Sequence, residues 1–554
     1  MLHGEHLIEA SIIEASIRQM LGNMYLGIGL YKEAEPHLEG ALQLFRAQLG
    51  EEHLTTLSSM KDLASLYSKQ GRYDEAEALY VDLLETGRGM LGEEHLETMR
   101  STDYLAWLYI KKGRYQEAEP LYVKVLEVRR RVLGEEHADT MHSMNALAWL
   151  YMKKGRYDKA EPLWVKALEG RRRVLGEEHA DTLYSMDHLG WVYYRLWRYN
   201  EAEPLMVKAL ETSRRVLGEE HQSTLRCMTN LACLYTSQGR YHEAELLSVE
   251  VVEIRRRVLG EEHEETLRST GTLAWVYYKQ GRYDKAEQLH IKSLEVRRRT
   301  LGEEHEDILP SMSGLALVYY DNARYDEAEE LLIKGLEISR RGKGDEDLMT
   351  LYYMKELGLV YCEQGRYNEA EELATKALET SQRVLGQKHF RTQDFMECLG
   401  LVYFGQGRLD EAQGLLVKAF EARRRVLGEA NPKTLKSMND LAVLYREQGR
   451  YDEAQPLFVK ELEGRRRVLG DEHPNTLTSM SDLALLYLEQ GRYDEAEPLA
   501  IACHSGRSTK FGPEHVFTQD AIQILIKLYE AWGKPGKAEE WRSKLPRKKG
   551  SQEQ

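Results

Sequence analysis

Histidine is the first residue to consider for chemistry, because it returns at one position of a repeated Gly-Glu-Glu-His segment. Imidazole nitrogens are common metal ligands, and a structural zinc site needs about four ligands around one ion. Successive copies are 42 residues apart, as His53 and His95 are, so units folded one after another keep them too far apart to share an ion. We expect loop structure and no metal site at these histidines: His53, His95, His137, His179, His221, His263, His305 and His473.

Catalytic motifs are absent from the sequence. It contains no GxxxxGK[ST] phosphate loop, since Gly536-Lys537-Ala538 is not one, and no HExxH, CxxC or GxSxG pattern. We therefore predict a protein that is not an enzyme, with no cofactor and no small-molecule substrate.

Arginine clusters recur near the end of most repeats and, taken alone, would suggest nucleic-acid binding. Each is followed within a few residues by acidic residues, and the net charge of the chain is −15. We expect them to pair across adjacent units and to complement helix ends, with no nucleic-acid partner. The clusters are 129–131, 171–173, 255–257, 297–299, 423–425 and 465–467.

Aromatic residues form a second regular set. Tryptophan holds one position in four repeats, and tyrosine follows three residues later in two of them, which places both on one helical face: Trp107, Trp149, Trp191, Trp275, Tyr194 and Tyr278. Exposed together, they would form an apolar strip suited to binding. The alternative is that these tryptophans pack between successive helices and belong to the core.

Basic residues accompany this aromatic ladder. The same face carries Arg100, Lys111, Lys153, Arg195, Arg226, Arg268 and Lys279, and the slot of Lys153 turns acidic later in the chain, at Asp321, Glu363, Glu447 and Glu489. This pattern predicts a basic, aromatic N-terminal half that suits an aromatic peptide with flanking carboxylates. The alternative is a solvated polar edge with no binding role.

The element that must position these residues is a unit of 42 residues, represented by Leu133 to Val174. Its apolar spacing is helical in two segments, and Gly155 separates them as a residue that accepts the left-handed conformation. Each unit is thus a helical hairpin that buries its apolar stripe against its neighbours. We predict an all-α fold, a right-handed α-solenoid of about thirteen 42-residue hairpins.

The repeat frame also predicts the boundaries. Residues 1–7 form a short tail, 8–48 a degenerate N-terminal capping hairpin, 49–510 eleven tandem hairpins, 511–544 a degenerate C-terminal cap, and 545–554 a disordered polar tail. Trp197 and Ala323 replace two turn glycines. The loop at 341–345 departs from the consensus, so we expect a soft joint between the eighth and ninth hairpins.

The unit resembles the tetratricopeptide repeat, whose spacing of large, small, tyrosine and glycine residues is met by Met144, Leu147, Ala148, Tyr151, Gly155, Tyr157 and Ala160. The longer unit is similar to the repeats of kinesin light chains and of fungal NLR/STAND-type proteins. The resemblance implies a protein-binding scaffold with its groove on the first helices, where the asparagines that clamp a peptide backbone in kinesin light chains have only a few counterparts: Asn145, Asn230 and Asn439. Two alternatives to a general scaffold follow from the resemblance. One is a sensor array of a STAND/NLR-type signalling system, and the other is a kinesin light chain-like cargo adaptor.

Composition limits the surroundings of the protein. No apolar run reaches the length of a membrane span, and the N-terminus lacks a signal-peptide pattern. The five cysteines have no paired spacing, which favours reduced thiols. We expect a cytoplasmic protein with protein or peptide ligands and no membrane contact; the sequence does not determine its oligomeric state.

Overall fold

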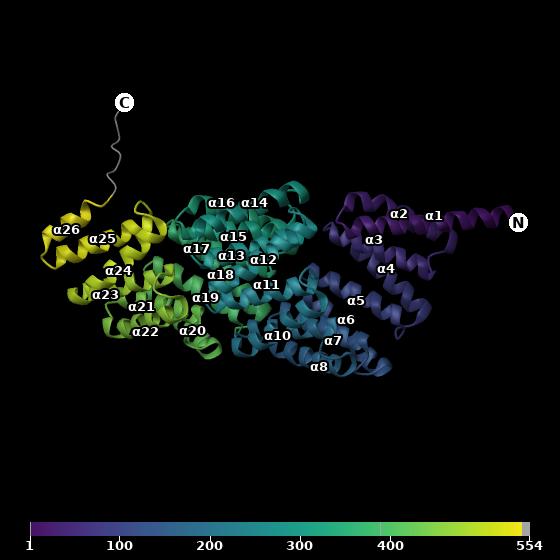
Figure 1. The fold of residues 1–554 in the computed structure, drawn as a ribbon, viewed down its shortest axis with the longest axis horizontal. Coiled ribbons are helices and arrows are strands. Elements are labelled where there is room, and N and C mark those ends of the chain that lie inside the picture. The colour runs from purple at the N-terminus through teal and green to yellow at the C-terminus, as the bar shows by residue number, and fades with distance from the viewer. Residues whose placement is uncertain (1, 388, 546–554) are drawn as a thin grey trace, which may run out of the picture. The chain divides into compact units, whose positions relative to one another are not determined.

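The computed structural model describes residues 2–387 and 389–545, with the backbone alone for residues 2–8 and 390. Over these residues the chain is an array of α-helices with one short 3₁₀ segment and no strand (Figure 1). It forms two compact units, Met1–Arg195 and Leu196–Gln554. The prediction of an all-α repeat solenoid is confirmed.

The first unit consists of helical hairpins stacked in chain order. Its helices are α1 (Leu2–Gly27), α2 (Tyr31–Leu49), α3 (Leu54–Lys69), α4 (Tyr73–Leu91), α5 (Leu96–Lys111), α6 (Tyr115–Leu133), α7 (Ala138–Lys153), α8 (Tyr157–Leu175) and α9 (Ala180–Arg195). Odd-numbered helices are the first helices of the hairpins. Helix α1 begins at Leu2 rather than near residue 8, so residues 2–7 continue the helix instead of forming a tail.

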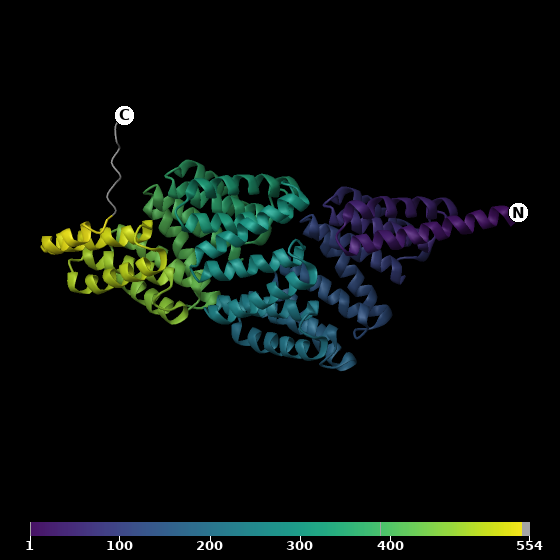
Figure 2. The same cartoon turned by 45° about the horizontal axis from the view of Figure 1, so that its top comes forward.

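The second unit continues the same pattern (Figure 2). Its helices are α10 (Tyr199–Leu217), α11 (Gln222–Ser237), α12 (Tyr241–Leu259), α13 (Glu264–Lys279), α14 (Tyr283–Leu301), η1 (Glu306–Ile308), α15 (Leu309–Asp321), α16 (Tyr325–Lys343), α17 (Leu348–Glu363), α18 (Tyr367–Leu385), α19 (Phe390–Gly405), α20 (Leu409–Leu427), α21 (Pro432–Glu447), α22 (Tyr451–Leu469), α23 (Pro474–Glu489), α24 (Tyr493–Phe511), α25 (Val516–Ala531) and α26 (Pro535–Arg542). The polar tail predicted at 545–554 lies, from residue 546 on, outside the described residues.

Small residues allow the two helices of each hairpin to approach closely. Alanines at the matching slots, such as Ala148 on α7 and Ala160 on α8, are fully buried. The larger residues around them, such as Leu150 and Trp164, fill the space between hairpins and are also fully buried. Within each unit the core therefore lies between stacked hairpins, as the repeat frame predicts.

Loop residues define the start and end of each helix. The histidine of the repeated loop is the N-cap of the next first helix: the Nδ1 of His137 accepts a hydrogen bond from the backbone N–H of Asp139 at 3.2 Å. This satisfies one of the free N–H groups of the first turn. Trp197 and Ala323 occupy the left-handed turn positions that other repeats give to glycine, with φ of 62° and 56°.

The junction between the eighth and ninth hairpins, where the sequence predicts a soft joint, has the same turn and cap geometry as the others. Gly344 has a φ of 82°, as the other C-cap glycines do, and Asp347 replaces the capping histidine by accepting from the N–H of Met349 at 2.8 Å. The boundary between the compact units lies instead at Arg195–Leu196, beside Trp197.

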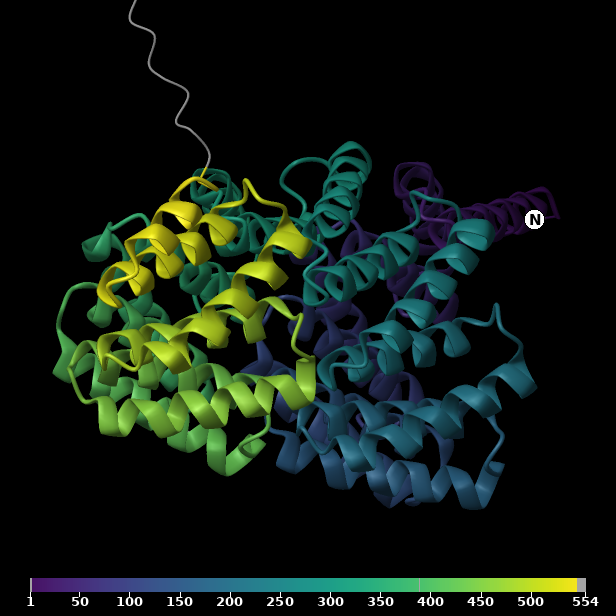
Figure 3. The same cartoon turned by 60° about the vertical axis from the view of Figure 1, so that its left-hand side comes forward.

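Within the second unit, the last hairpins return to the helices near residues 241–322 (Figure 3). The ring of His473 stacks on Tyr241 at 5.7 Å, and Phe511 stacks on Tyr283 at 5.9 Å. The Nε2 of His473 lies 2.7 Å from the carbonyl oxygen of Lys279. The hairpin array of this unit therefore coils far enough for distant repeats to touch.

Candidate functional site

The aromatic ladder of the first unit lies at the surface of its first helices. Trp107 on α5 and Trp149 on α7 each leave 38% of their surface exposed. The ammonium group of Lys111 lies 5.2 Å from the ring of Trp107, and that of Lys153 lies 4.5 Å from the ring of Trp149. Each lysine is one turn after its tryptophan, so the helix itself builds a repeated pair of aromatic ring and cation.

The other predicted residues of the first unit lie around this ladder. Trp191 on α9 is half-buried and contacts Tyr194 with ring centroids 4.8 Å apart. Arg195 lies over the ring of Tyr157 at 5.7 Å. Arg100 is exposed and donates to Glu97 at 2.8 Å.

Asn145 is the most unusual of the predicted residues. It lies on α7, only 5% exposed, and neither its amide nitrogen nor its amide oxygen has a hydrogen-bond partner among the described residues. Buried amides in folded proteins are nearly always paired, because an unpaired one loses its hydration without replacement. Both amide atoms are shielded from solvent by the chain itself, so in this conformation the Asn145 side chain is a buried polar group and not an exposed contact.

A hollow opens beside Trp275 in the second unit, with a cavity volume of about 360 Å³. It lies on the first-helix face of four successive hairpins, and small residues create it. The lining includes Trp275, Arg268, Leu267, Gly271, Thr272 and Leu317, together with Cys233 and Tyr352 from the neighbouring first helices. Gly314 is required there, because a Cβ at this position would lie 2.2 Å from the Cε1 of His290.

Two of the polar groups that line this hollow are His290 on α14 and Arg268 on α13. Burial lowers the pKa of His290 to about 4, so the imidazole is neutral near pH 7, and its Nδ1 has no hydrogen-bond partner among the described residues. Arg268 is exposed and pairs with Glu264 and Glu265.

The remaining predicted residues of the second unit lie on α11 and α13. Tyr278 stacks on Trp275 at 5.2 Å, and Lys279 lies over the same ring at 4.3 Å. Burial lowers the pKa of Lys279 to about 8. Arg226 and Asn230 are half-buried on α11.

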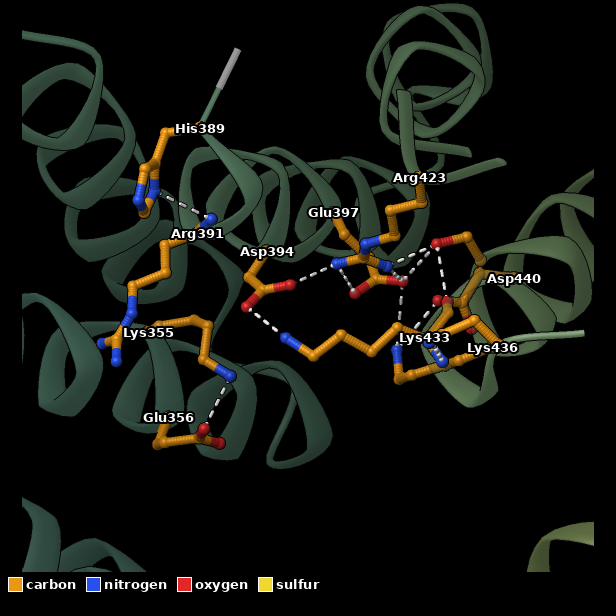
Figure 4. A network of polar contacts seen from close by, with 12 residues as sticks. Lys355, Glu356, His389, Arg391, Asp394, Glu397, Arg423, Lys433, Lys436 and Asp440 are labelled. Carbon is orange, nitrogen blue, oxygen red and sulfur yellow. Dashed lines mark hydrogen bonds and ion pairs between the residues drawn. The ribbon is translucent and has the colours of Figure 1, made fainter. Parts of the chain in front are cut away.

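A network of ion pairs occupies the corresponding face of α17, α19 and α21 (Figure 4). Its centre is Arg423 of α20, only 2% exposed. The guanidinium donates to Glu397 at 2.7 and 3.0 Å and to Asp394 at 2.6 Å. Lys433 donates to the other oxygen of Asp394 at 2.7 Å, and Lys436 lies 3.5 Å from Glu397.

The network shifts the pKa values of its carboxyl groups. Burial alone would raise the pKa of Asp394, but Lys433, Arg423 and Lys355 together lower it to about 2. Arg423 and Lys436 likewise hold the pKa of Glu397 well below its usual value against the effect of burial. Burial raises the pKa of Asp440, although Lys436 opposes the shift.

The carboxylates of the acidic slot in the C-terminal half contact neighbouring side chains. Asp321 accepts from the hydroxyl of Tyr283 at 3.4 Å, and Glu363 from that of Tyr320 at 3.2 Å. Arg446 pairs with Glu447 at 2.8 Å and lies 3.8 Å from Glu489. Only the last two carboxylates of the slot therefore have a base beside them in these contacts.

The arginine clusters divide into two roles. As expected, later arginines of the clusters pair across adjacent hairpins, as Arg173 does with Glu136 at 2.8 Å. The first arginine of each cluster is instead buried. Arg171 donates to the hydroxyl of Ser185 at 2.6 Å and to the carbonyl of Asp181 at 3.1 Å, both on the next first helix. The sequence analysis missed this role; the periodic Arg–Ser spacing was the available signal.

No group of three His, Cys, Asp or Glu side chains among residues 2–387 and 389–545 converges as a metal site. No helix within these ranges has the length and apolar character needed to cross a membrane.

Solved structures similar to this chain include two crystal structures of TPR-like repeats from a putative kinesin light chain of Podospora anserina. One is 29% identical and covers 36% of this chain and 95% of its own, with a TM-score of 0.32. The other is 30% identical and covers 37% and 98%, with a TM-score of 0.32. BtubC (BKLC) from P. vanneervenii is 24% identical over 42% of this chain and 92% of its own, with a TM-score of 0.35. No curated protein matches the chain.

Family models described as tetratricopeptide repeat match most of the chain. One matches residues 13–88, 63–124, 97–163, 247–299, 276–341, 307–383, 391–465 and 441–507. A second with the same description matches residues 182–223 and 224–265. These ranges coincide with the helical hairpins of the structure, and the chain belongs to the tetratricopeptide repeat family.

Proposed function

We propose that this protein is a binding scaffold whose helices α5, α7 and α9 capture an extended peptide with an aromatic residue among carboxylates. The observation that carries the proposal is a repeated pair of exposed ring and cation on successive first helices, Trp107 with Lys111 and Trp149 with Lys153.

The neighbouring side chains suit the rest of the peptide. The exposed faces of Trp107 and Trp149 bury apolar and aromatic side chains. Lys111 and Lys153 hold positive charge over those rings, next to which a ligand carboxylate gains an opposite charge. The site therefore favours a ligand that is aromatic and acidic together.

The hollow beside Trp275 supports a second binding position in the other unit. Its volume is at the lower end of the range of ligand pockets. Arg268 stands at its edge, and the neutral imidazole of His290 lies inside it. An apolar side chain with an acidic neighbour fits this arrangement.

A binding titration tests the proposal. Fluorescently labelled peptides with one tryptophan between aspartates are titrated with the full chain and with Trp107→Ala/Trp149→Ala. We expect the double variant to bind at least about tenfold more weakly, because buried aromatic anchors dominate such interfaces, with unchanged helicity by circular dichroism. Leu246→Ala, an exposed apolar residue on α12, is the control. Equal affinity in all three proteins contradicts the proposal.

The STAND-sensor and cargo-adaptor alternatives differ from each other in the source of the peptide. Proximity labelling followed by a search of the recovered partners for an ATP-binding domain separates them. A nucleotide-binding signalling partner supports the sensor array, and a motor subunit supports the adaptor.

A further inference from the structure

The hollow beside Trp275 is lined by a buried arginine. Arg297 of α14 is 5% exposed and donates to the hydroxyl of Ser311 on the next first helix. Its Nε has no hydrogen-bond partner, and its guanidinium forms no ion pair among the described residues. Burial lowers the pKa of Arg297, although Asp307 and Glu264 oppose the shift. The hollow therefore holds a positive charge that has lost its hydration without gaining a carboxylate partner.

Equivalent arginines of two other hairpins have a carboxylate at a fixed position of the repeat. Both pairs span 26 residues and have an N–O distance of 2.7 Å: Arg129 with Asp103, and Arg423 with Glu397 (Figure 4). The same interval from Arg297 leads to Gly271. This hairpin thus keeps the arginine of the pair and lacks its carboxylate.

Space remains where that carboxylate would extend. Gly271 lines the hollow, and a Cβ added to it would meet no atom within 4 Å. The second acid of the later network, Asp394, corresponds to Arg268 three repeats earlier. The two positions that hold acids around Arg423 therefore hold an open space and a base around Arg297.

The other charged and titratable groups of the hollow leave Arg297 as its buried charge. Glu264 pairs with Arg268. The side chain of Asp307 is 50% exposed, so solvent screens its charge. Burial and the charge of Arg297 lower the pKa of His290 to about 4, and its ring is neutral near pH 7. An incoming carboxylate therefore meets an opposite buried charge, with one facing acid already paired and the other exposed to water.

We propose that this hollow binds the carboxylate side chain of an acidic peptide, which occupies the space over Gly271 and pairs with Arg297. The inference rests on the proposed role of the hollow as a second binding position and identifies what the acidic residue contacts. Trp275, Leu267 and Leu317 line the same hollow and suit an apolar residue beside the acid. A guanidinium binds a carboxylate through charge-assisted hydrogen bonds, which are stronger than neutral ones.

A carboxylate built into the chain tests the geometry without a ligand. In Gly271→Asp the new side chain stands where Asp103 and Glu397 stand in their hairpins, so we expect it to pair with Arg297. Hydrogen exchange of α13 and α14 in increasing urea measures the effect, and Gly271→Asn is the isosteric control. Protection of these helices persists to higher urea in the Asp variant than in the Asn variant. Equal midpoints mean that a carboxylate over Gly271 does not reach Arg297, which overturns the proposal.

A binding titration tests the ligand. Labelled alanine-based peptides with one Leu-Asp or one Leu-Asn pair are titrated with the full chain carrying Trp107→Ala/Trp149→Ala. We expect the Asp peptide to bind at least about tenfold more tightly, because a hydrogen bond to a charged group is worth about 1.5–3 kcal/mol. Adding Arg297→Ser removes this preference; serine holds the same position in the next hairpin, as Ser339. A preference that survives Arg297→Ser overturns the proposal.

A matched control and the choice of background make the outcome specific to the hollow. Arg507→Ser removes another buried arginine, which is 7% exposed and does not line the hollow; this variant keeps the preference for the Asp peptide. The tryptophans of the first unit are absent from every protein in this titration, so its result does not depend on the site at α5, α7 and α9. Equal affinity for the two peptides contradicts the pairing with Arg297 alone. Failure of both peptides to bind contradicts the second binding position and the pairing together.

Discussion

Two walls of first helices can be compared: one is formed by α5, α7 and α9, and the other by α17, α19 and α21. They carry different kinds of side chain at equivalent positions of the repeat. The slot of Trp149 holds Leu359, Leu401 and Val443 in the later wall. On the first wall, lysines lie over exposed rings, and the buried amide of Asn145 has no hydrogen-bond partner among the described residues. On the second wall, Arg423 forms ion pairs with its acidic neighbours. The same repeat backbone therefore carries exposed aromatic rings with cations on one wall and a buried ion-pair network on the other, and the side chains at each repeat position decide which.

The largest expected effect is on the paired wall. Arg423→Ser leaves Glu397 buried beside Asp394 without its main counter-charge, which costs about 3–5 kcal/mol of unfolding free energy. Urea unfolding followed by circular dichroism, with hydrogen exchange of α19 to α21, measures the loss. Lys153→Ser on the ligand-facing wall changes stability by less than about 0.5 kcal/mol, because the side chain is exposed.

The chain offers a natural control for this substitution. The eighth hairpin has Ser339 at the arginine slot and Ser313 at the slot of Glu397. Arg423→Ser/Glu397→Ser copies that neutral pair and recovers part of the stability, since no uncompensated Glu397 charge remains. If the double variant is as unstable as the sum of the single ones, the network is not the source of the effect.

Two tryptophans in one hairpin sharpen the comparison within the first unit. Trp164 is fully buried, whereas Trp149 is 38% exposed. Trp164→Ala leaves a cavity and costs about 3–5 kcal/mol, but Trp149→Ala costs about 1–2 kcal/mol because its site stays open to solvent. Thermal unfolding measures both. Equal losses would place the ladder in the core and contradict its role in binding.

The dependence of stability on acid pH also distinguishes the two walls. The pKa of Asp394 is about 2, below the unfolded value of 3.8, so its ionisation stabilises the fold above pH 3.8, and that contribution is lost as the pH falls through 2. The shift corresponds to about 2 kcal/mol. Asp394→Asn therefore flattens the pH dependence of unfolding between pH 4 and 2. Asp158→Asn, an exposed residue of the Trp149 hairpin, is measured alongside as a carboxyl outside the network.

The fold was predictable because local and periodic signals agree. Glycine positions with positive φ, alanines at the helix contacts and a constant 42-residue period specify each hairpin and its neighbour. The capping role of the loop histidine was also visible, since Asp347 and Asn431 replace it at the same position.

The site was predictable only in part. The ladder repeats one slot, which a periodic sequence displays directly. The ion-pair network combines different repeat positions of three first helices with Arg423 from α20. A single repeat position followed along the sequence shows the charge of one partner only, so the pairing is not visible in it.

The smallest effect concerns the charge of the ligand-facing wall. Lys153→Glu reverses one exposed charge over Trp149, so binding of an acidic peptide weakens by about threefold to tenfold at low salt, mainly through slower association. The difference disappears near 1 M salt, where exposed charges are screened within about 3 Å. Stopped-flow association at two ionic strengths measures it, and a salt-independent loss would mean that Lys153 acts through packing. Lys355→Glu is the counterpart on the paired wall, where Lys355 contacts Glu356 at 2.6 Å. There the reversal lowers stability and leaves binding of that peptide unchanged, because the charge belongs to the fold and not to the ligand.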